Sequence, residues 1–205
     1  MSVDTITINR QRGIFEGQAS FWLFGYGSLL YKAGFPYLEY RPATIRGWSR
    51  RFWQGSHDHR GTPEAPGRVA TLVEEPGAVC TGMAYRITPE VLEPLDVREK
   101  NGYLRFTTTL MFADGDTAQG LVYIATEDND AFLGPAPAME MARHIAQSSG
   151  PSGPNRDYLV GVAAALGRLG AEDAHVANLM QALQEVETGS ETRRAGRSPA
   201  RPGTV

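Results

Sequence analysis

The sequence contains a single cysteine, Cys80, and no long hydrophobic run. One cysteine cannot form a disulfide within the chain, which excludes a disulfide-stabilised scaffold and suits a reducing compartment. A membrane-spanning helix needs about 18 or more consecutive apolar residues, and no stretch approaches that length. The first residues also lack the layout of a secretory signal. We therefore expect a cytoplasmic protein that binds no membrane.

The chain also lacks an excess of charge of either sign. Its 205 residues include 20 Lys and Arg against 23 Asp and Glu, for a formal net charge of −3. Proteins that bind nucleic acids through phosphate groups carry a basic surface, so this balance predicts no nucleic-acid partner. The length predicts one domain, large enough to bury a core without metal or disulfide support.

The two ends of the chain contain few large apolar residues. We expect residues 1–18 to form a flexible arm. Residues 187–205 contain four Arg and no Leu, Ile or Phe, and we expect them to form a disordered Arg-rich tail. Such segments bury too little apolar surface to offset the entropy lost on ordering. The folded domain is predicted to span residues 19–186.

Within this domain, strand-like segments precede helix-like ones. The strand candidates are rich in β-branched and aromatic residues and are bounded by turn residues. They are 21–24, 44–52, 68–73, 79–87, 105–112 and 120–125. Helices are expected from Thr88, over 138–148, and after Asn155 and Asp173, both of which we expect to act as N-caps. This order predicts an α+β fold whose mixed or antiparallel sheet closes toward a small barrel.

A glycine-containing loop, residues 25–30 (GYGSLL), follows the first predicted strand. A sharp turn there can present several N–H groups to an anion. The loop lacks the last Gly of the dinucleotide-binding fingerprint and the Gly-Lys of a P-loop. From residue types alone, a plain turn and a binding site for a substrate carboxylate remain equally open.

A charged cluster near residue 100 is a second candidate site. The segment LDVREKNGY, residues 95–103, contains Glu99, which can act as a general base if burial raises its pKa. Clusters of this kind at helix ends are more often solvated surface. His57 and His59 flank Asp58 but provide too few ligands for a metal ion, so we expect no metal site.

Basic and aromatic residues alternate in SRRFWQGS, residues 49–56. On a strand, Arg50 and Phe52 would face the core, and Arg51 and Trp53 the opposite side. The pattern is compatible with binding a nucleic-acid strand by charge and stacking. It is at least as compatible with a small acidic ligand held by one Arg.

Seven blocks of sequence, taken together, are far more specific than any one of these motifs. They are GYGSL (25–29), SRRFWQGS (49–56), DHRGTPEAPGRVATLVE (58–74), AYR (84–86), LDVREKNGY (95–103), LGPAP (133–137) and GPSGPNRDYL (150–159). In this order they resemble the ChaC-like glutathione-specific γ-glutamylcyclotransferases over roughly residues 20–185. The resemblance implies a small mixed β-barrel flanked by helices, in agreement with the order of strands and helices.

The resemblance also implies an activity, the cleavage of glutathione into 5-oxoproline and Cys-Gly with no metal or cofactor. Glu99 takes the place of the family's general base, and Tyr158 that of a substrate-contacting tyrosine. Arg51 is a candidate for the glycine end of glutathione. The loop implied to hold the γ-glutamyl group comprises Gly25, Tyr26, Gly27, Ser28, Leu29 and Leu30.

In this chemistry the α-amine of the substrate attacks its own γ-carbonyl and closes a five-membered ring, so no nucleophile from the protein is needed. Glu99 would carry the proton from the ammonium to the departing nitrogen, and N–H groups of the loop would bind the carboxylate or oxyanion. Three alternatives stay open. They are a cyclotransferase for other γ-glutamyl amines, a non-catalytic glutathione-binding protein, and an interaction module that uses the Arg-rich tail. The sequence does not distinguish a monomer from a dimer.

Overall fold

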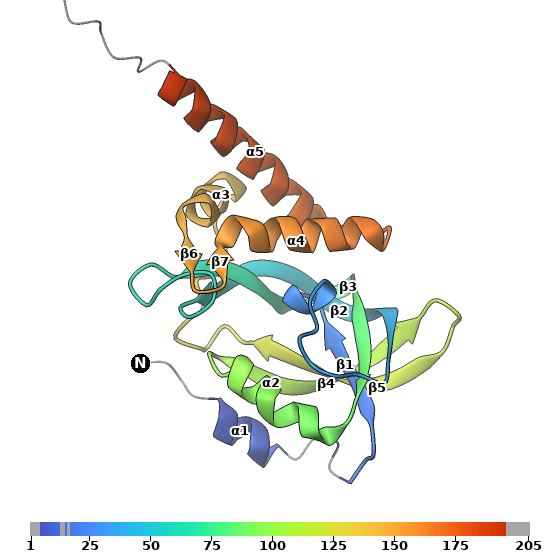
Figure 1. Cartoon of the computed structure of the whole chain (residues 1–205). Helices are drawn as coiled ribbons and strands as arrows, with labels where there is room; N and C mark the ends of the chain where they lie inside the picture. The colour runs from blue at the N-terminus through green and yellow to red at the C-terminus, as the bar shows by residue number, and fades with distance from the viewer. Residues whose placement is uncertain (1–4, 13–14, 16, 196–205) are drawn as a thin grey trace, which may run out of the picture.

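The computed structural model describes residues 5–12, 15 and 17–195. Five strands form a closed barrel in the order β1-β3-β2-β4-β5, with helices packed around it (Figure 1). β1 pairs parallel with β5, and the other pairs are antiparallel. The strands are β1 (Phe21–Gly25), β2 (Glu39–Ser56), β3 (Gly67–Ile87), β4 (Tyr103–Phe112) and β5 (Thr117–Ala125). A mixed barrel with helices confirms the predicted α+β fold.

β2 and β3 are longer than the sequence pattern predicted. The segments 68–73 and 79–87, expected to be two strands, are joined into one strand of 21 residues. Between them lies the turn-like Pro76-Gly77, which forms part of an irregularity opposite Gly47 instead of ending the strand. Gly47 and Gly77 both have positive φ, +79° and +86°. The two strands can therefore bend together at a bulge without separating.

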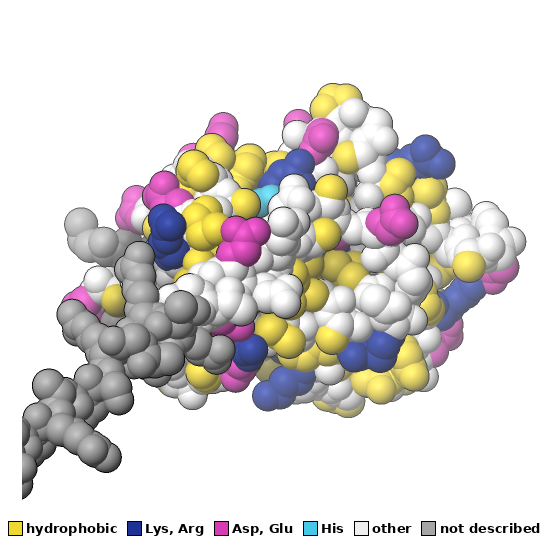
Figure 2. Space-filling view, turned by 90° about the horizontal axis from the view of Figure 1, so that it is seen from above, with side chains coloured by type: hydrophobic (Ala, Val, Ile, Leu, Met, Phe, Trp, Pro, Cys, Tyr) yellow, Lys and Arg dark blue, Asp and Glu magenta, His cyan; other side chains and the backbone are white. Residues whose placement is uncertain are grey.

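The helices lie on two sides of the barrel. Figure 1 shows α3, α4 and α5 gathered above it, while α1 and α2 lie below. Viewed from above, the helix-covered face carries basic and acidic side chains interspersed (Figure 2). The helical elements are α1 (Ile6–Gln11), η1 (Ser28–Leu30), η2 (Pro89–Val91), α2 (Leu92–Arg98), α3 (Ala138–Gln147), α4 (Asn155–Arg168) and α5 (Ala174–Ala195), with a short hairpin of β6 (Ser149–Gly150) and β7 (Gly153–Pro154) before α4. Of the helices that the structure describes, none is long and apolar enough to cross a membrane.

The largest hydrophobic cluster joins the barrel interior to the upper helices. Phe24 and Phe52 from the strands belong to the same buried cluster as Leu159 and Val162 of α4 and Leu179 of α5. Burial of Phe52 and of Arg50, at 0% and 2% exposure, confirms that these two residues face the core. The barrel and the helices consequently share one core.

One predicted helix cap is confirmed and the other is wrong. Asp173 accepts a hydrogen bond from the N–H of Val176 through Oδ1 at 3.0 Å, as an N-cap should. Asn155 is fully buried and does not cap α4. Its amide bonds the main chain of Arg68 instead, accepting from N–H at 2.7 Å and donating to the carbonyl at 2.8 Å. A buried amide needs both partners, and β3 supplies them.

The structure differs from expectation at both ends. Part of the expected flexible arm, residues 1–18, forms α1, in which Asn9 is completely buried. The expected disordered tail began at residue 187, yet α5 continues to Ala195. Extending an existing helix costs little, and Arg156 on α4 forms an ion pair with Glu187. Residues 196–205 of the expected tail lie outside the described residues.

Candidate active site

A cavity of about 610 Å³ lies where the carboxyl end of β1 meets α2 and α4. Its walls come from the loop after β1, the end of β2 with residues 58–60, the start of β3, the C-terminal end of α2 and the first turn of α4. Segments far apart in the sequence thus meet around one space. The cavity includes Glu99, Tyr158 and five of the six predicted loop residues, Gly25, Tyr26, Gly27, Ser28 and Leu29.

Leu30 is the exception among the predicted loop residues. Its side chain is 5% exposed and belongs to the core cluster. The chain turns at η1, where the N–H of Leu30 donates to the carbonyl of Gly27 at 3.0 Å. The amides of Ser28 and Leu29 belong to the first turn of η1, where N–H groups have no partner within the helix. Both residues line the cavity.

Glu99 is the C-cap residue of α2. Its N–H donates to the carbonyl of Leu95 at 2.8 Å, and its own carbonyl accepts from the N–H of Tyr103 at 3.3 Å. The carboxylate lies 3.3 Å from Nε of Arg98, and the Glu99 side chain is 18% exposed. Burial raises the pKa of Glu99, against the opposing effects of Arg98 and His59. A carboxylate with a raised pKa is a better proton acceptor than one in water.

Two tyrosines meet at the main chain of Ala70 in the cavity wall. The Tyr158 hydroxyl accepts from the N–H of Ala70 at 3.2 Å, and the Tyr103 hydroxyl donates to the Ala70 carbonyl at 2.8 Å. Burial raises the pKa of both phenols, and the charge of Glu99 adds to each shift. Both hydroxyls therefore stay protonated beside the carboxylate. Because Tyr158 accepts at Ala70, its own proton is available to a substrate.

Positive side chains line the cavity beside the acidic ones. Lys32, Arg60 and Arg98 line it together with Asp58 and His59. Arg98, the residue before Glu99, donates to the Ser28 hydroxyl at 2.7 Å. This bond connects the end of α2 to the loop after β1. Cations and protonated phenols around the half-buried Glu99 carboxylate suit a small molecule that carries carboxylates and an ammonium group.

Comparison with known proteins identifies the family to which this chain belongs. The family model described as ChaC-like protein matches residues 21–186. The chain belongs to the ChaC-like family. It is 46% identical over 182 residues to the Arabidopsis thaliana protein named γ-glutamylcyclotransferase 2-3, covering 83% of this chain and 92% of that protein. It is 43% identical to glutathione-specific γ-glutamylcyclotransferase 1 of Danio rerio, covering 75% and 83% respectively.

A solved structure of a family member has the same fold. The crystal structure of the yeast γ-glutamyl cyclotransferase specific to glutathione matches with a TM-score of 0.76 at 34% identity. The match covers 82% of this chain and 97% of the yeast chain. The ChaC-like resemblance inferred from the seven sequence blocks is therefore confirmed.

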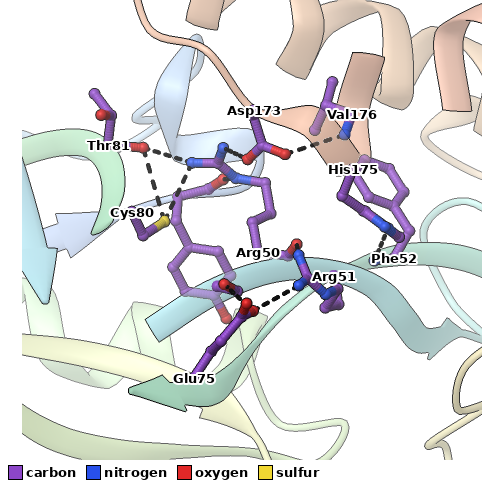
Figure 3. Close-up of polar contacts among 11 residues, drawn as sticks. Arg50, Arg51, Phe52, Glu75, Cys80, Thr81, Asp173, His175 and Val176 are labelled. Carbon is purple, nitrogen blue, oxygen red and sulfur yellow. Dashed lines mark hydrogen bonds and ion pairs between the residues drawn. The ribbon is translucent and has the colours of Figure 1, made fainter. Parts of the chain in front are cut away.

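In this ChaC-like chain a buried arginine holds the loop after β1. Arg50 donates through Nε to the carbonyl of Tyr26 at 2.7 Å, and its other nitrogens bond Asp173 at 2.6 Å and the carbonyl of Thr81 at 2.5 Å (Figure 3). Arg50 also approaches Cys80 Sγ at 3.5 Å. Burial raises the pKa of the Cys80 thiol, so Cys80 is a core residue and not a nucleophile.

Two other sequence candidates do not contribute to the cavity. Arg51 extends from the opposite side of β2 and bonds Glu75 at 2.6 Å (Figure 3), so the suggestion that it holds the glycine end of glutathione is wrong for this structure. His57 does not line the cavity, whereas His59 does. Within the described part of the chain, no three His, Cys, Asp or Glu side chains are placed to hold a metal ion.

Several cavity residues of this family member escaped the sequence reasoning. Tyr103 ends the block LDVREKNGY. Its position in that block, four residues after Glu99, is the sequence feature that indicates a place in the site. Arg98 directly precedes Glu99. Lys32 gave no signal, because a single cation outside a pattern resembles an ordinary surface residue, and Arg60 lies in the block 58–74, where nothing distinguishes it from the other charged residues. Only the folding of β1, β2 and α2 toward one space brings them together.

Proposed function

We propose that this protein is a glutathione-specific γ-glutamylcyclotransferase, with Glu99 as its general base and acid. The substrate class is supported by the relatives, including the Danio rerio and yeast proteins that carry this name. The observation that carries the assignment of Glu99 is the placement of its carboxylate in the cavity, with a raised pKa, beside protonated Tyr103 and Tyr158. The family match over 21–186 supports a single catalytic domain.

The reaction begins when the ionised Glu99 carboxylate accepts a proton from the α-ammonium group of glutathione. The freed amine nitrogen attacks the γ-carbonyl carbon of the same molecule and closes a five-membered ring. Holding the two reacting groups in this bent conformation is worth an effective molarity of roughly 10⁵–10⁸ M. The main task of the cavity is consequently to hold the folded substrate, which the cations and loop amides are placed to do.

Negative charge develops on the carbonyl oxygen as the ring closes. The Tyr158 hydroxyl and the amides of Ser28 and Leu29 are the donors that can stabilise it. The C–N bond to the cysteine residue then breaks, and Glu99 gives its proton to the departing nitrogen. The ring nitrogen loses its second proton to solvent, and the released amine takes one up. The products are 5-oxoproline and Cys-Gly, and Glu99 returns to its ionised state.

Replacement of Glu99 tests this assignment directly. The purified protein and its Glu99→Gln variant are incubated with reduced glutathione, and 5-oxoproline and Cys-Gly are quantified together. Because an amide cannot accept the proton, we expect kcat to fall by about 10²–10⁴-fold with an unchanged unfolding curve. The exposed Glu172 lies outside the cavity, so Glu172→Gln is the matched control and should keep full activity.

The products distinguish the proposal from its rivals. Equal amounts of 5-oxoproline and Cys-Gly support it, whereas free glutamate would indicate hydrolysis and contradict ring closure. Faster release of 5-oxoproline from γ-glutamyl-alanine than from glutathione would assign the site to other γ-glutamyl amines. Turnover by a folded Glu99→Gln protein at the wild-type rate would remove Glu99 from the mechanism.

We also infer that the protein acts in the cytoplasm. Its one cysteine is buried in the core, so its fold does not depend on an oxidising compartment. Fractionation of cells that express a tagged full chain tests this, since recovery in the membrane or extracellular fraction would contradict it.

A further inference from the structure

The N-terminal helix packs against the segment that carries Glu99, although it lies outside the family match. The match begins at residue 21, whereas α1 comprises Ile6–Gln11 and lies next to α2 (Figure 1). Thr5 and Asn9 are 2% and 0% exposed. Burying two polar residues so completely is costly unless they are hydrogen-bonded, so their partners define what this helix does.

Thr5 binds the turn that directly follows α2. Its N–H and its hydroxyl both donate to the carbonyl of Lys100, at 3.2 Å and 3.0 Å. The hydroxyl also approaches the carbonyl of Glu99 at 3.5 Å. The carbonyl groups of the last helical turn have no partner within the helix. Thr5 therefore holds the main chain directly after Glu99, the residue whose side chain lines the cavity.

Asn9 binds the first residues of β4 through both ends of its amide. Nδ2 donates to the carbonyl of Tyr103 at 3.0 Å, and Oδ1 accepts from the N–H of Arg105 at 2.9 Å. β4 pairs with β5 along one edge, but on the other edge it meets β2 only near its far end, at Phe112 and Met111. The Asn9 amide takes the place of a neighbouring strand where β4 begins.

The side chain of Arg105 extends this contact back to α2. Its Nε and Nη2 bond the two carboxylate oxygens of Asp96 at 2.9 Å and 2.5 Å. Tyr123 donates to the same carboxylate at 2.7 Å. Asp96 lies three residues before Glu99, in the last turn of α2. Contacts that start at Thr5 and Asn9 thus reach the chain on both sides of Glu99.

We infer that Thr5 and Asn9 are positioning residues that hold segment 99–105, so that Glu99 and Tyr103 keep their places in the cavity. This inference rests on the proposed function. Neither Thr5 nor Asn9 lines the cavity, so their effect is on the alignment of the base and not on substrate contacts. Misplacement of a catalytic group by about 1 Å can lower the rate by about 10²-fold.

Kinetics of three variants test the inference. We expect Asn9→Leu to lower kcat for glutathione by about tenfold to a hundredfold with little change in KM. Thr5→Val, which keeps the shape and loses the hydroxyl, should lower kcat less, and Thr5→Ser should retain it. The matched control is Arg10→Gln on the same helix, because the Arg10 side chain is exposed and forms an ion pair with the exposed Glu93. It should leave kcat unchanged.

The pH profile separates positioning from simple loss of stability. If segment 99–105 shifts, the surroundings of the Glu99 carboxylate change, and the acid limb of kcat should move in Asn9→Leu and Thr5→Val but not in Arg10→Gln. A folded Asn9→Leu protein with wild-type kcat and pH profile overturns the inference, as does a loss confined to KM. If Asn9→Leu does not fold, Thr5→Val alone decides between these outcomes.

Hydrogen exchange gives a readout that needs no turnover. Amides of segment 99–105 should exchange faster in Asn9→Leu and Thr5→Val than in the wild type, while those of α4 keep their protection. Unchanged exchange in this segment overturns the inference. A wild-type protein that releases no 5-oxoproline overturns the proposed function instead, and the exchange data still decide whether α1 holds this segment.

Discussion

The guanidinium of Arg50 is buried and donates a hydrogen bond of 2.7 Å to the main-chain carbonyl of Tyr26. The same guanidinium pairs with Asp173 at the start of α5. The loop after β1, strand β3 and the start of α5 are thus connected through one buried side chain. A planar group with five donors can serve these partners at once, and a lysine cannot.

Replacement of Arg50 should be among the most damaging single changes in the protein. Arg50→Met leaves Asp173 and the Tyr26 carbonyl without their partner, and breaking a buried pair in this way costs about 3–5 kcal/mol. Arg50→Lys should also be destabilising because it cannot form all the bonds. Denaturant unfolding monitored by circular dichroism measures both changes.

Asp173→Asn is the informative comparison for Arg50. The amide oxygen can still cap α5, as Oδ1 does at 3.0 Å from the N–H of Val176, while the negative charge is lost. We expect a smaller loss of stability than for Arg50→Met. Equal losses for the two variants would show that the charge of Asp173, and not the set of hydrogen bonds, accounts for the role of Arg50.

Gly27→Ala should lower activity strongly while the protein still folds. A Cβ atom at this position would lie 2.7 Å from the Tyr158 hydroxyl, so the phenol must shift from its position. We expect kcat/KM to fall by about 10²-fold. Gly167 near the end of α4 has open space around it, and Gly167→Ala should keep activity and add about 0.5–1 kcal/mol of stability. Normal activity of Gly27→Ala would exclude a close role for the Tyr158 hydroxyl.

The pH dependence of turnover should reflect the raised pKa of Glu99. The base must be ionised, so kcat/KM should rise with pH through a pKa above the ordinary value of about 4.3 for a glutamate. Asp58 raises this pKa and His59 lowers it. The acid limb should move to lower pH in Asp58→Asn and to higher pH in His59→Asn. Shifts in the same direction would contradict Glu99 as the titrating group.

His175 should make the folded protein less stable in acid. Burial, with the nearby charge of Arg51, lowers its pKa to about 4, and its Nε2 accepts the N–H of Phe52 at 3.0 Å (Figure 3). The unfolded value is about 6.5, so the unfolded chain binds more protons between these values. Stability should therefore fall as the pH decreases from about 6.5 to about 4.

The comparison variant for this prediction is His175→Gln, which keeps an acceptor for Phe52 but does not titrate. Because His175 is partly exposed, we expect a difference of about 1 kcal/mol between pH 7 and pH 4, or roughly 2–4 °C in Tm. Thermal unfolding of both proteins across this pH range measures the difference. Identical pH slopes would show that His175 is not the group responsible.

Much of this architecture could be predicted from the sequence. Segments rich in β-branched and aromatic residues and bounded by turn residues located the five strands of the barrel, but not the short hairpin of β6 and β7, and the order of strands and helices predicted the fold class. The joining of two predicted strands into β3 was not predictable, because Pro76-Gly77 is a turn signal in isolation. Only the pairing with β2 across Gly47 converts it into a bulge.

The site was predictable to the extent that its residues lie in motifs. Glu99 and the loop after β1 were identified through the family resemblance, while residue types alone favoured solvated surface for Glu99. Docking of α1 was missed because Thr5 and Asn9 act through hydrogen bonds to distant main chain. Such contacts produce no hydrophobic period in the sequence. The amide of Asn155 was misassigned for the same reason.

The parallel pairing of β1 with β5 has a consequence for how the protein folds. β2 and β3 follow each other in sequence and can pair early, but Trp22 of β1 lies opposite Gly120 of β5, almost one hundred residues away. Contacts of such large sequence separation are slow to form. The glycine loop continues directly from β1, so the cavity forms only when β1 pairs with β5. A chain whose barrel has not closed contains every residue of the site, but these residues do not yet surround a cavity.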